Sequence, residues 1–453
     1  MLSTRTPLLA ETVRKLVARG AHANAFNILS RLHPSDIASI LGELSEHLRR
    51  DAFQNLHKRD IRLASAAISE LGPERGASLL SEMTSQEISV ILQELDPDDA
   101  AVFVPRLPPE LQEEILGAMR KKEASDVEDL LQYPDQTAGR IMSPKVFSLN
   151  QGTTVEEAIR RLQDAGDLEM VFYIYVVDDH GNLVGVLSLR QLLLKRPHTK
   201  LADIMEPDVI RVATDTDQEE VAQLVASYNL LAIPVVDSLN KLVGVITVDD
   251  VIDVIKEEAT EDMYRLAGLD REERVFTRPS TSVAKRIPWL VLNLGTAFIA
   301  ALVVSLFENT ISQFALLAVF MPVVPLLGGN AGNQTLTVMV RGIALGELSW
   351  SNSRKALFKE VLVGIVNGIT IGLLVGLAAF LWKGNPWLGV VLSLAMVGTL
   401  LVAAVMGTLI PLALRWLKVD PALASSVFVT TATDVTGFLL FLGLGALFLS
   451  RFQ

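Results

Sequence analysis

The pattern of hydrophobic positions changes twice along the chain. From about Leu8 to Tyr133, Leu, Ile and Ala recur at helical spacing with few β-branched runs, which predicts one helix after another. From Gln136 to about Val254, short apolar strands, Gly/Asn/Asp turns and helices alternate, as is typical of an α/β domain. From Ile287 onward come five long runs with little or no charge. We therefore expect a multidomain protein with an all-α domain at 1–134, an α/β pair at 135–254, a connecting segment at 255–283 and a five-helix α transmembrane domain at 284–453.

The N-terminal segment contains repeated helix-start signals. Ser, Thr, Asp or Pro stands at a cap or first-turn position in His33-Pro-Ser-Asp, Met83-Thr-Ser-Gln, Leu95-Asp-Pro-Asp and Leu107-Pro-Pro-Glu. The stretches 36–44 and 87–95 look like one repeat used twice, which predicts a small superhelical, armadillo-like domain. Its acidic corner, Asp96, Asp98 and Asp99, can serve capping and solubility, or a cation-dependent contact with the next domain.

The α/β segment is a tandem repeat. Residues 141–146 align with 204–209, and 175–188 align with 234–247. The segment resembles a CBS-domain pair, which implies a regulatory module that pairs with itself and often senses adenine nucleotides such as ATP. The second repeat has a hydroxyl and an acid, Thr247 and Asp250, where nucleotide phosphate and ribose would bind, whereas the first repeat has Ser188 and Gln191. We expect at most one nucleotide site, and a purely structural pair is an equal alternative.

An acidic helix is predicted to leave the second repeat. It carries Asp249, Asp250, Asp253, Glu257, Glu258, Glu261 and Asp262. Spacings of three and four place several of these acids on one broad face, where like charges destabilise a helix. The face is either solvated or docks on another acidic surface with the help of divalent cations.

The five apolar runs are each long enough to cross a bilayer. They are Ile287–Phe307, Thr310–Val340, Val361–Trp382, Gly384–Leu414 and Pro421–Ser450. Basic residues gather before the first run, between the second and third, and between the fourth and fifth. The positive-inside rule then makes those loops and the N-terminal domains cytoplasmic and the C-terminus extracytoplasmic. The N-terminus also lacks a secretory hydrophobic region.

Polar residues interrupt two of these runs. The second carries Asn330, Asn333, Gln334, Thr335 and Thr337, and the fifth carries Thr430, Thr431, Thr433, Asp434 and Thr436. Close packing between membrane helices is enough to explain why Thr and Gly occur in these runs. It does not explain Asp434, which is the only acid in the five runs and has no Lys, Arg or His there as a partner. Oxygen-only surroundings favour a hard divalent cation, and two copies of Asp434 in a homodimer would supply more charge.

Composition narrows the function classes. The formal net charge of -12 argues against nucleic acid as a partner and favours cations. With no Cys and 6 His, thiolate sites are excluded and soft-metal chemistry is disfavoured. A membrane-embedded enzyme with a regulatory pair would need catalytic groups that the five runs lack. An anion transporter would need basic residues there.

Two motifs carry a specific resemblance. Pro325-Leu-Leu-Gly-Gly-Asn-Ala-Gly-Asn-Gln-Thr, and Asp420-Pro-Ala-Leu-Ala-Ser followed by Thr430-Thr-Ala-Thr-Asp-Val-Thr-Gly, resemble the MgtE family of magnesium channels, and the order of domains matches too. The resemblance implies a homodimeric, magnesium-selective channel in the cell membrane, surrounded by lipid and gated by cytosolic Mg²⁺. Transport of another divalent cation, Co²⁺ or Mn²⁺, stays open.

The resemblance also implies roles for individual residues. Asp434 would select the ion with Asn333 and Thr337 beside it, Gly329 and Gly437 would let the helices approach, and Asn330 and Thr430 are further candidates for the pore. The acidic helix resembles the family's plug helix, which closes the pore when Mg²⁺ bridges it. Its regulatory acids, opposite the N domain, the partner CBS unit or the loop before the fifth run, would be Asp96, Asp99, Asp250, Asp253, Glu258, Glu261, Asp262 and Asp420.

Overall fold

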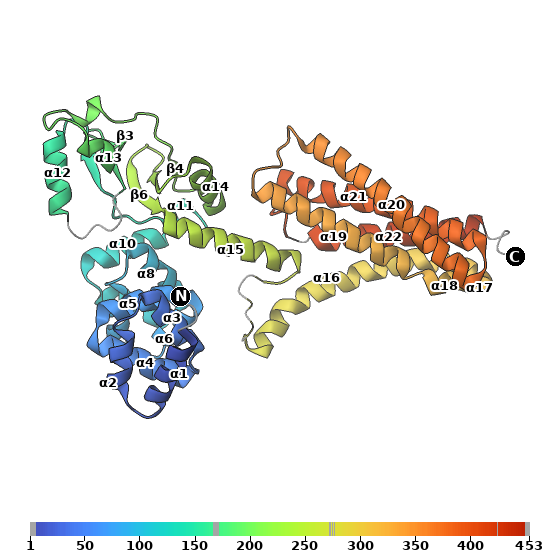
Figure 1. Ribbon diagram of the computed structural model, residues 1–453, viewed down its shortest axis with the longest axis horizontal. Coiled ribbons are helices and arrows are strands. Elements are labelled where there is room, and N and C mark those ends of the chain that lie inside the picture. Colours follow the sequence, from blue (N-terminus) through green and yellow to red (C-terminus); the bar gives the residue numbers. More distant parts are fainter. Residues whose placement is uncertain are drawn as a thin grey trace. The chain divides into compact units, whose positions relative to one another are not determined.

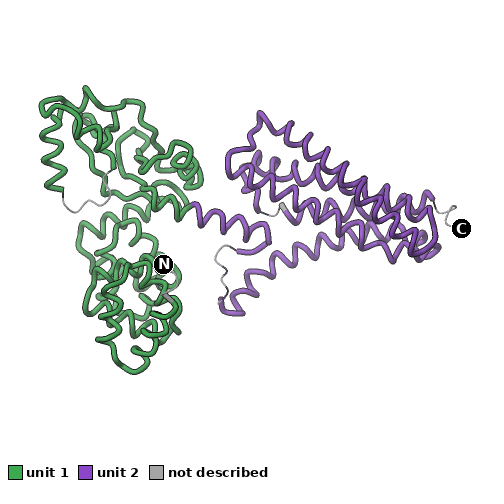
Figure 2. The backbone as a smooth tube through the Cα atoms, in the orientation of Figure 1, with its two compact units in different colours: residues 1–254 green, residues 255–453 purple. Residues whose placement is uncertain are grey.

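The structure is a computed structural model that describes residues 6–165, 172–270, 273, 275, 277–423 and 425–448. It divides into two compact units, residues 1–254 and 255–453, and the division falls inside one long helix (Figure 2). The first unit holds the N-terminal helices and two small sheets, and the second holds the apolar helices (Figure 1). Each unit has its own hydrophobic core.

The N-terminal region is a stack of short helices, as predicted. They are α1 (Thr6–Ala18), α2 (His22–Leu29), α3 (Pro34–Glu43), α4 (Glu46–Arg59), α5 (Ile61–Glu70), α6 (Pro73–Leu80), α7 (Ser85–Leu92), α8 (Pro97–Phe103), the 3₁₀ turn Val104–Arg106, α9 (Pro109–Ala118) and α10 (Lys121–Leu131). Pro34, Pro97 and Pro109 stand in first turns, and Thr84 forms a capping box with Glu87. The predicted start signals therefore mark real helix starts.

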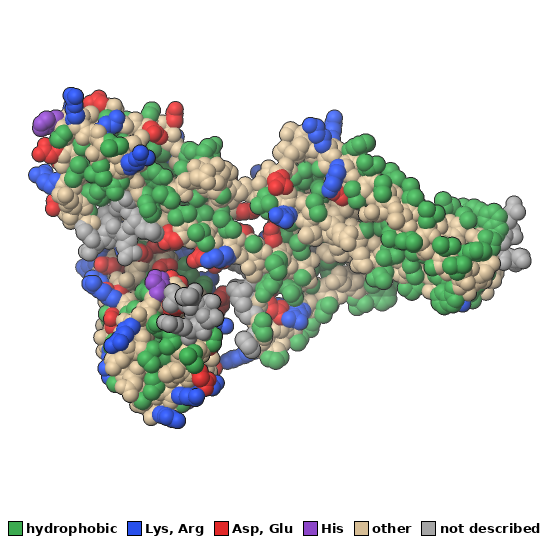
Figure 3. Space-filling model, viewed as in Figure 1, with side chains coloured by type: hydrophobic (Ala, Val, Ile, Leu, Met, Phe, Trp, Pro, Cys, Tyr) green, Lys and Arg blue, Asp and Glu red, His purple; other side chains and the backbone are tan. Residues whose placement is uncertain are grey.

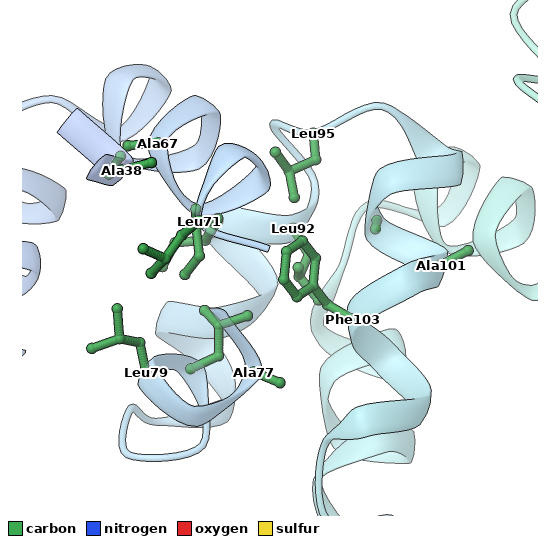
Figure 4. Close-up of a cluster of buried hydrophobic side chains, with 14 of the residues drawn as sticks. Ala38, Ala67, Leu71, Ala77, Leu79, Leu92, Leu95, Ala101 and Phe103 are labelled. Atoms are coloured by element: carbon green, nitrogen blue, oxygen red, sulfur yellow. The ribbon is translucent and has the colours of Figure 1, made fainter. Parts of the chain in front are cut away.

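The core of this helical region is made mainly of Leu, Ile and Ala, with two buried rings, Phe53 and Phe103. Phe103 is buried and lies among leucines of neighbouring helices (Figure 4). A Cβ added to Gly76 would lie 2.5 Å from Cε1 of Phe103, so α6 approaches the ring only because this residue is a glycine.

Two three-stranded sheets follow, and they confirm the tandem repeat. The first contains β1 (Ser148–Asn150), β2 (Tyr173–Val177) and β3 (Leu183–Ser188), and the second contains β4 (Val212–Ala213), β5 (Ala232–Val236) and β6 (Leu242–Thr247). In both sheets, the first strand pairs parallel with the middle strand, and the third strand pairs antiparallel with it. In both, the antiparallel pairing has an irregularity just before the last residue of the middle strand. The accompanying helices are α11 (Ala138–Ile141), α12 (Val155–Asp164), α13 (Leu189–Leu193), the 3₁₀ turn Leu201–Asp203, α14 (Gln218–Tyr228) and α15 (Val248–Leu266).

Beyond α15, the second unit is all helix. Its elements are α16 (Pro279–Ser305), α17 (Glu308–Gln313), α18 (Leu316–Phe320), α19 (Val323–Ala344), α20 (Ser353–Lys383), α21 (Pro386–Trp416) and α22 (Ser425–Leu447). Five stretches of the described chain are long and apolar enough to cross a membrane: Pro279–Ser305, Leu316–Ala344, Ser353–Lys383, Pro386–Trp416 and Ser426–Leu447. The end of the fifth predicted run, Ser450, lies outside the described residues.

The space-filling view agrees with a bilayer around these helices. Hydrophobic side chains cover most of the visible face of the second unit, and most of its visible Lys and Arg side chains lie toward the end where α20 begins (Figure 3). Among the crossing helices, α21 is the most buried and forms the centre of the bundle. Helices α19, α20 and α22 pack against α21, and α16 packs against α22. Their outer faces are left for lipid.

The second run is interrupted at its two prolines: α18 ends at Phe320, and α19 begins at Val323 with Pro322 as its N-cap residue and Pro325 in its first turn. One prediction about these helices needs correction. Helix α20 begins eight residues before the predicted Val361, so Glu360 lies in the bundle and is 3% exposed. The expectation that Asp434 is the only acid in the bundle is therefore wrong, and the basic Lys359 also belongs to this helix.

Candidate cation site

The candidate site lies where α19 and α22 pack closely. A Cβ on Gly332 would lie 2.6 Å from Cγ1 of Val429, and a Cβ on Gly437 would lie 3.4 Å from Cα of Pro325. Small residues thus let the two backbones approach, as is common between membrane helices. These two contacts pair the helices antiparallel and place Asp434 level with Leu327 and Gly328, about 4 Å along the axis from Asn330. Asn333 and Thr337 lie farther along α19, about 8 and 14 Å from that level.

Further contacts of the same kind surround this level. A Cβ on Gly329 would lie 3.8 Å from Oγ1 of Thr433 and 3.9 Å from Cγ2 of Thr430. These are ordinary contacts, whereas a Cβ on Gly328 would lie only 2.5 Å from Cγ2 of Thr399 in α21. Gly328 and Gly332 are therefore tighter than Gly329, and the sequence did not single them out.

Hydroxyl groups of both helices are already committed to local hydrogen bonds. Thr337 Oγ1 donates to the carbonyl of Asn333 at 2.9 Å, and Thr433 Oγ1 donates to the carbonyl of Thr430 at 2.9 Å. Asn333 Oδ1 in turn accepts a hydrogen bond from Oγ of Ser426 at 3.2 Å, which joins α19 to α22. The hydroxyl and amide oxygens keep lone pairs that can accept hydrogen bonds from the water molecules around a hydrated ion.

Asp434 stands out from these neighbours. Its side chain is half-buried in α22, and no hydrogen bond or ion pair joins it to another described residue. A carboxylate at membrane depth is costly unless water, a partner or an ion offsets it. Asn330 of α19 is exposed and leaves an amide oxygen open close to this depth, whereas the exposed Thr337 lies more than two turns farther along α19.

This donor set suits one kind of ion. It offers one carboxylate with amide, hydroxyl and backbone oxygens, and among the described residues no three His, Asp or Glu side chains come together to hold a metal ion. Mg²⁺ dehydrates reluctantly and keeps several waters, so it can be held through its water shell by few charged ligands. The arrangement therefore fits a hydrated hard cation better than a fully protein-coordinated one.

The first unit contains a second acidic region, where the start of α8 meets the start of α15. Asp99 accepts a hydrogen bond from Oγ of Ser69 at 2.7 Å, and Asp250 accepts one from Oγ1 of Thr247 at 2.6 Å. Oδ1 of Asp98 is buried without a hydrogen-bond partner. The structure thus places Asp98, Asp99 and Asp250 near one another, although among the described residues they do not form a ready-made metal site, and it leaves a carboxylate oxygen of Asp98 available.

The pKa values of these acids show how strongly they repel. Burial, followed by the charges of Asp250 and Asp99, holds the pKa of Asp98 well above its ordinary value. Burial also raises the pKa of Asp99, and burial with the nearby charges of Asp249 and Asp99 raises the pKa of Asp250 to about 6. Bringing these groups together costs free energy unless a proton or a cation neutralises them.

Two other predicted regulatory acids of the first unit take different positions. Asp96 is the N-cap residue of α8 and forms an ion pair with Nζ of Lys145 at 2.6 Å, and its charge helps to raise the pKa of Asp98 and Asp99. Asp253 is exposed on α15. Asp98 belongs to the predicted acidic corner, although it is not among the regulatory acids that the resemblance implies, and it takes a more buried position than Asp96.

The end of α15, in the second unit, is held by an arginine. Arg265 forms ion pairs with both Glu261 of its own helix and Asp420 of the loop before α22. Asp262 is half-buried, and burial raises its pKa. Glu258 is half-buried as well.

Sequence reasoning missed Arg265, Ser426 and Glu360. A signal existed for Arg265, because it lies four residues after Glu261 on a helix. Glu360 was missed because three basic residues precede it and suggested an interfacial segment. Ser426 gives no signal by itself, since its role depends on the register of α22 against α19.

Comparison with known proteins accounts for nearly the whole chain. A profile described as a divalent cation transporter matches residues 321–444, one described as the MgtE intracellular N domain matches 22–136, and CBS-domain profiles match 138–197 and 201–257. The magnesium transporter MgtE of Thermus thermophilus is 36% identical over 97% of this chain and 98% of its own length. That of Bacillus subtilis is 35% identical over 93% of each.

Solved structures resemble the cytosolic part. A structure of the cytosolic domain of the Mg²⁺ channel MgtE in complex with ATP is 37% identical, with a TM-score of 0.51 over 54% of this chain and 99% of that one. A structure of the soluble part of a magnesium transporter is 30% identical, with a TM-score of 0.50 over 56% and 99%. With its profiles, relatives and five apolar helices in agreement, the chain belongs to the MgtE family of magnesium transporters, multi-pass membrane proteins that are not enzymes.

Proposed function

We propose that this protein is a magnesium-selective channel of the inner or plasma membrane, and that Asp434 is its ion-selecting carboxylate. The observation that carries the proposal is the half-buried Asp434, which has no hydrogen-bond or ion-pair partner among the described residues and lies at the level of the α19 glycines that meet Thr433. Asn333, Thr337, Asn330 and Thr430 supply oxygens for the water shell of the ion, while Gly329 and Gly437 allow the close approach of α19 and α22. A homodimer supplies a second Asp434 and so a charge that matches a dication.

Gating follows from the acidic cluster. Without Mg²⁺ the carboxylates Asp98, Asp99 and Asp250 repel, and with Mg²⁺ they are neutralised and α15 is held against α8. In this proposal the exposed Asp253 meets the partner's CBS pair, and Glu258, Glu261, Asp262 and Asp420 form the second magnesium-sensitive contact, near the pore. Sites of this kind, with few shared carboxylates, work at millimolar concentrations.

As a secondary proposal, the CBS pair binds an adenine nucleotide. The cytosolic domain of the related channel was solved with ATP. In this chain Thr247 remains a candidate for phosphate contact, and Asp250 would be shared between the nucleotide and the acidic cluster, since both residues cap α15. ATP binding would then change the charge balance that Mg²⁺ also controls.

The proposal is tested by Mg²⁺ flux into liposomes that contain the full chain. Asp434→Asn removes the charge at constant size and should lower Mg²⁺ flux at least tenfold, because one lost charge-assisted contact is worth roughly 1.5–3 kcal/mol. Glu308→Gln, an exposed acid of α17, is the control and should conduct normally. Unchanged flux in Asp434→Asn would refute the proposal, and equal flux of Co²⁺ or Mn²⁺ would replace magnesium selectivity with general divalent transport.

A further inference from the structure

A cavity on the other face of α19 contains a buried carboxylate that the pore does not use. Its volume is about 180 Å³, and it lies between α19, α20 and α21. Its polar lining residues are Gln334, Thr335, Lys359, Glu360 and Asn367. About six waters at roughly 30 Å³ each would fill such a volume.

Glu360 is the charged group at the bottom of this cavity. Its side chain is 5% exposed, Oε2 accepts a hydrogen bond from Oγ1 of Thr335 at 3.1 Å, and Oε1 pairs with Nζ of Lys359. Glu360 stands seven residues beyond Ser353, about 10 Å along α20 at 1.5 Å per residue. A buried carboxylate at this depth is costly unless a counter-charge offsets it.

Lys359 supplies that counter-charge in an unusual way. It precedes Glu360 directly, and consecutive helical residues point in different directions, so the lysine must fold back to reach the carboxylate. Its side chain is 61% exposed. The pair therefore combines a fixed, buried acid with a mobile cation that can leave toward water.

Two amides complete the donor set. Gln334 and Asn367 are exposed at the mouth of the cavity, and neither side chain forms a hydrogen bond with another described residue. Unpaired amides on a membrane helix cost free energy. Together with Thr335 and Glu360 they offer neutral oxygens and one negative charge around a single space.

We propose that this cavity is an exchangeable site for a small monovalent cation, sodium in the first instance, and that the ammonium of Lys359 is its built-in competitor. One carboxylate and one monovalent ion leave the cavity neutral, as Lys359 does now, whereas a divalent ion would leave an excess positive charge at membrane depth. The hard oxygen ligands favour an alkali ion over a soft metal. The inference does not rest on the pore proposal, because Glu360 and Asp434 are separate sites.

The test is a titration of the purified full chain with NaCl against choline chloride at constant ionic strength, read out as hydrogen exchange of the α20 amides near Glu360. Lys359→Gln removes the competitor, so protection by sodium should appear at a concentration at least tenfold lower than in the wild type. Glu360→Gln should abolish sodium-specific protection. Lys355→Gln, an exposed lysine one turn earlier, is the matched control and should behave as the wild type.

Three results would overturn the site: no sodium-specific protection in Lys359→Gln, equal protection in Glu360→Gln, or equal protection by Mg²⁺ at the same charge concentration. If Lys359→Gln does not fold, the binding of radioactive sodium to the wild-type protein tests the site instead. The proposal expects one saturable ion per subunit that remains in Asp434→Asn, and no saturable binding overturns it. Loss of that ion in Asp434→Asn would assign it to the pore instead.

Discussion

Asp434 in α22 and Asp98 in α8 are both acids in places where charge is expensive, but their surroundings differ. Asp434 has the hydroxyl and backbone oxygens of Thr430 and Thr433 nearby on α22 and no described ion-pair partner. Asp98 has a buried oxygen without a hydrogen bond and two further carboxylates, Asp99 and Asp250, close enough to raise its pKa. A single charge among neutral oxygens holds an ion loosely enough to release it. Several repelling carboxylates instead make the packing of two helices depend on a cation.

The largest effect expected within this comparison is a pH dependence of the α8–α15 contact. The pKa of Asp250 is raised to about 6, above its ordinary value of 3.8. The folded contact therefore binds the proton more tightly than the separated one, so it gains stability as pH falls through 6 and loses it as pH rises. At about 1.4 kcal/mol per pKa unit, the full effect is about 3 kcal/mol and is reached only below pH 3.8. About 1 kcal/mol of it falls between pH 7.5 and 5.5.

Hydrogen exchange of the first turn of α15, corrected for intrinsic rates, measures this effect in the full chain. Without Mg²⁺, protection should increase between pH 7.5 and 5.5. At saturating Mg²⁺ the dependence should shrink, because the cation already neutralises the carboxylates. Lower protection at pH 5.5 than at pH 7.5 without Mg²⁺ would contradict the proposed difference between the two acidic regions.

A smaller effect is expected at the end of α15. Arg265→Gln removes the ion pairs with Glu261 and Asp420, which are partly buried, so the end of the helix should lose about 1 kcal/mol of local stability. Faster exchange of amides near Leu266 would show it, and Arg278→Gln, before α16, serves as the control. If Mg²⁺ restored protection in Arg265→Gln, the cation could replace the arginine there. An unchanged exchange rate would mean that packing alone holds this end.

Much of this architecture could be predicted from the sequence. Helix starts at Pro34, Pro97 and Pro109, the two matched sheets and the five apolar helices follow from local signals, because caps and periodicity act within a few residues. The unusual place of Asp434 was evident for the same reason, since depth in a bilayer is set by the run around it.

What the sequence could not predict depends on the register between distant elements. The hydrogen bond from Ser426 to Asn333 joins residues far apart in the chain, and the burial of Asp98 depends on where α15 begins. Glu360 was placed outside the bundle because nearby lysines mark an interface, yet the hydroxyl of Thr335 in another helix donates a hydrogen bond to it. Local chemistry identified the acids, and tertiary packing decided which of them are buried together.

The most direct test of the account compares Asp434→Asn with Asp98→Asn in one flux experiment. Both full-length variants are placed in liposomes, and Mg²⁺ flux is measured at low and at high Mg²⁺ on the side of the N-terminal domains. The account predicts that Asp434→Asn conducts poorly at both concentrations. It predicts that Asp98→Asn still conducts but responds much less to Mg²⁺ on that side. Conduction by Asp434→Asn, or wild-type magnesium dependence in Asp98→Asn, would contradict the assignment of one acid to the pore and the other to the sensor.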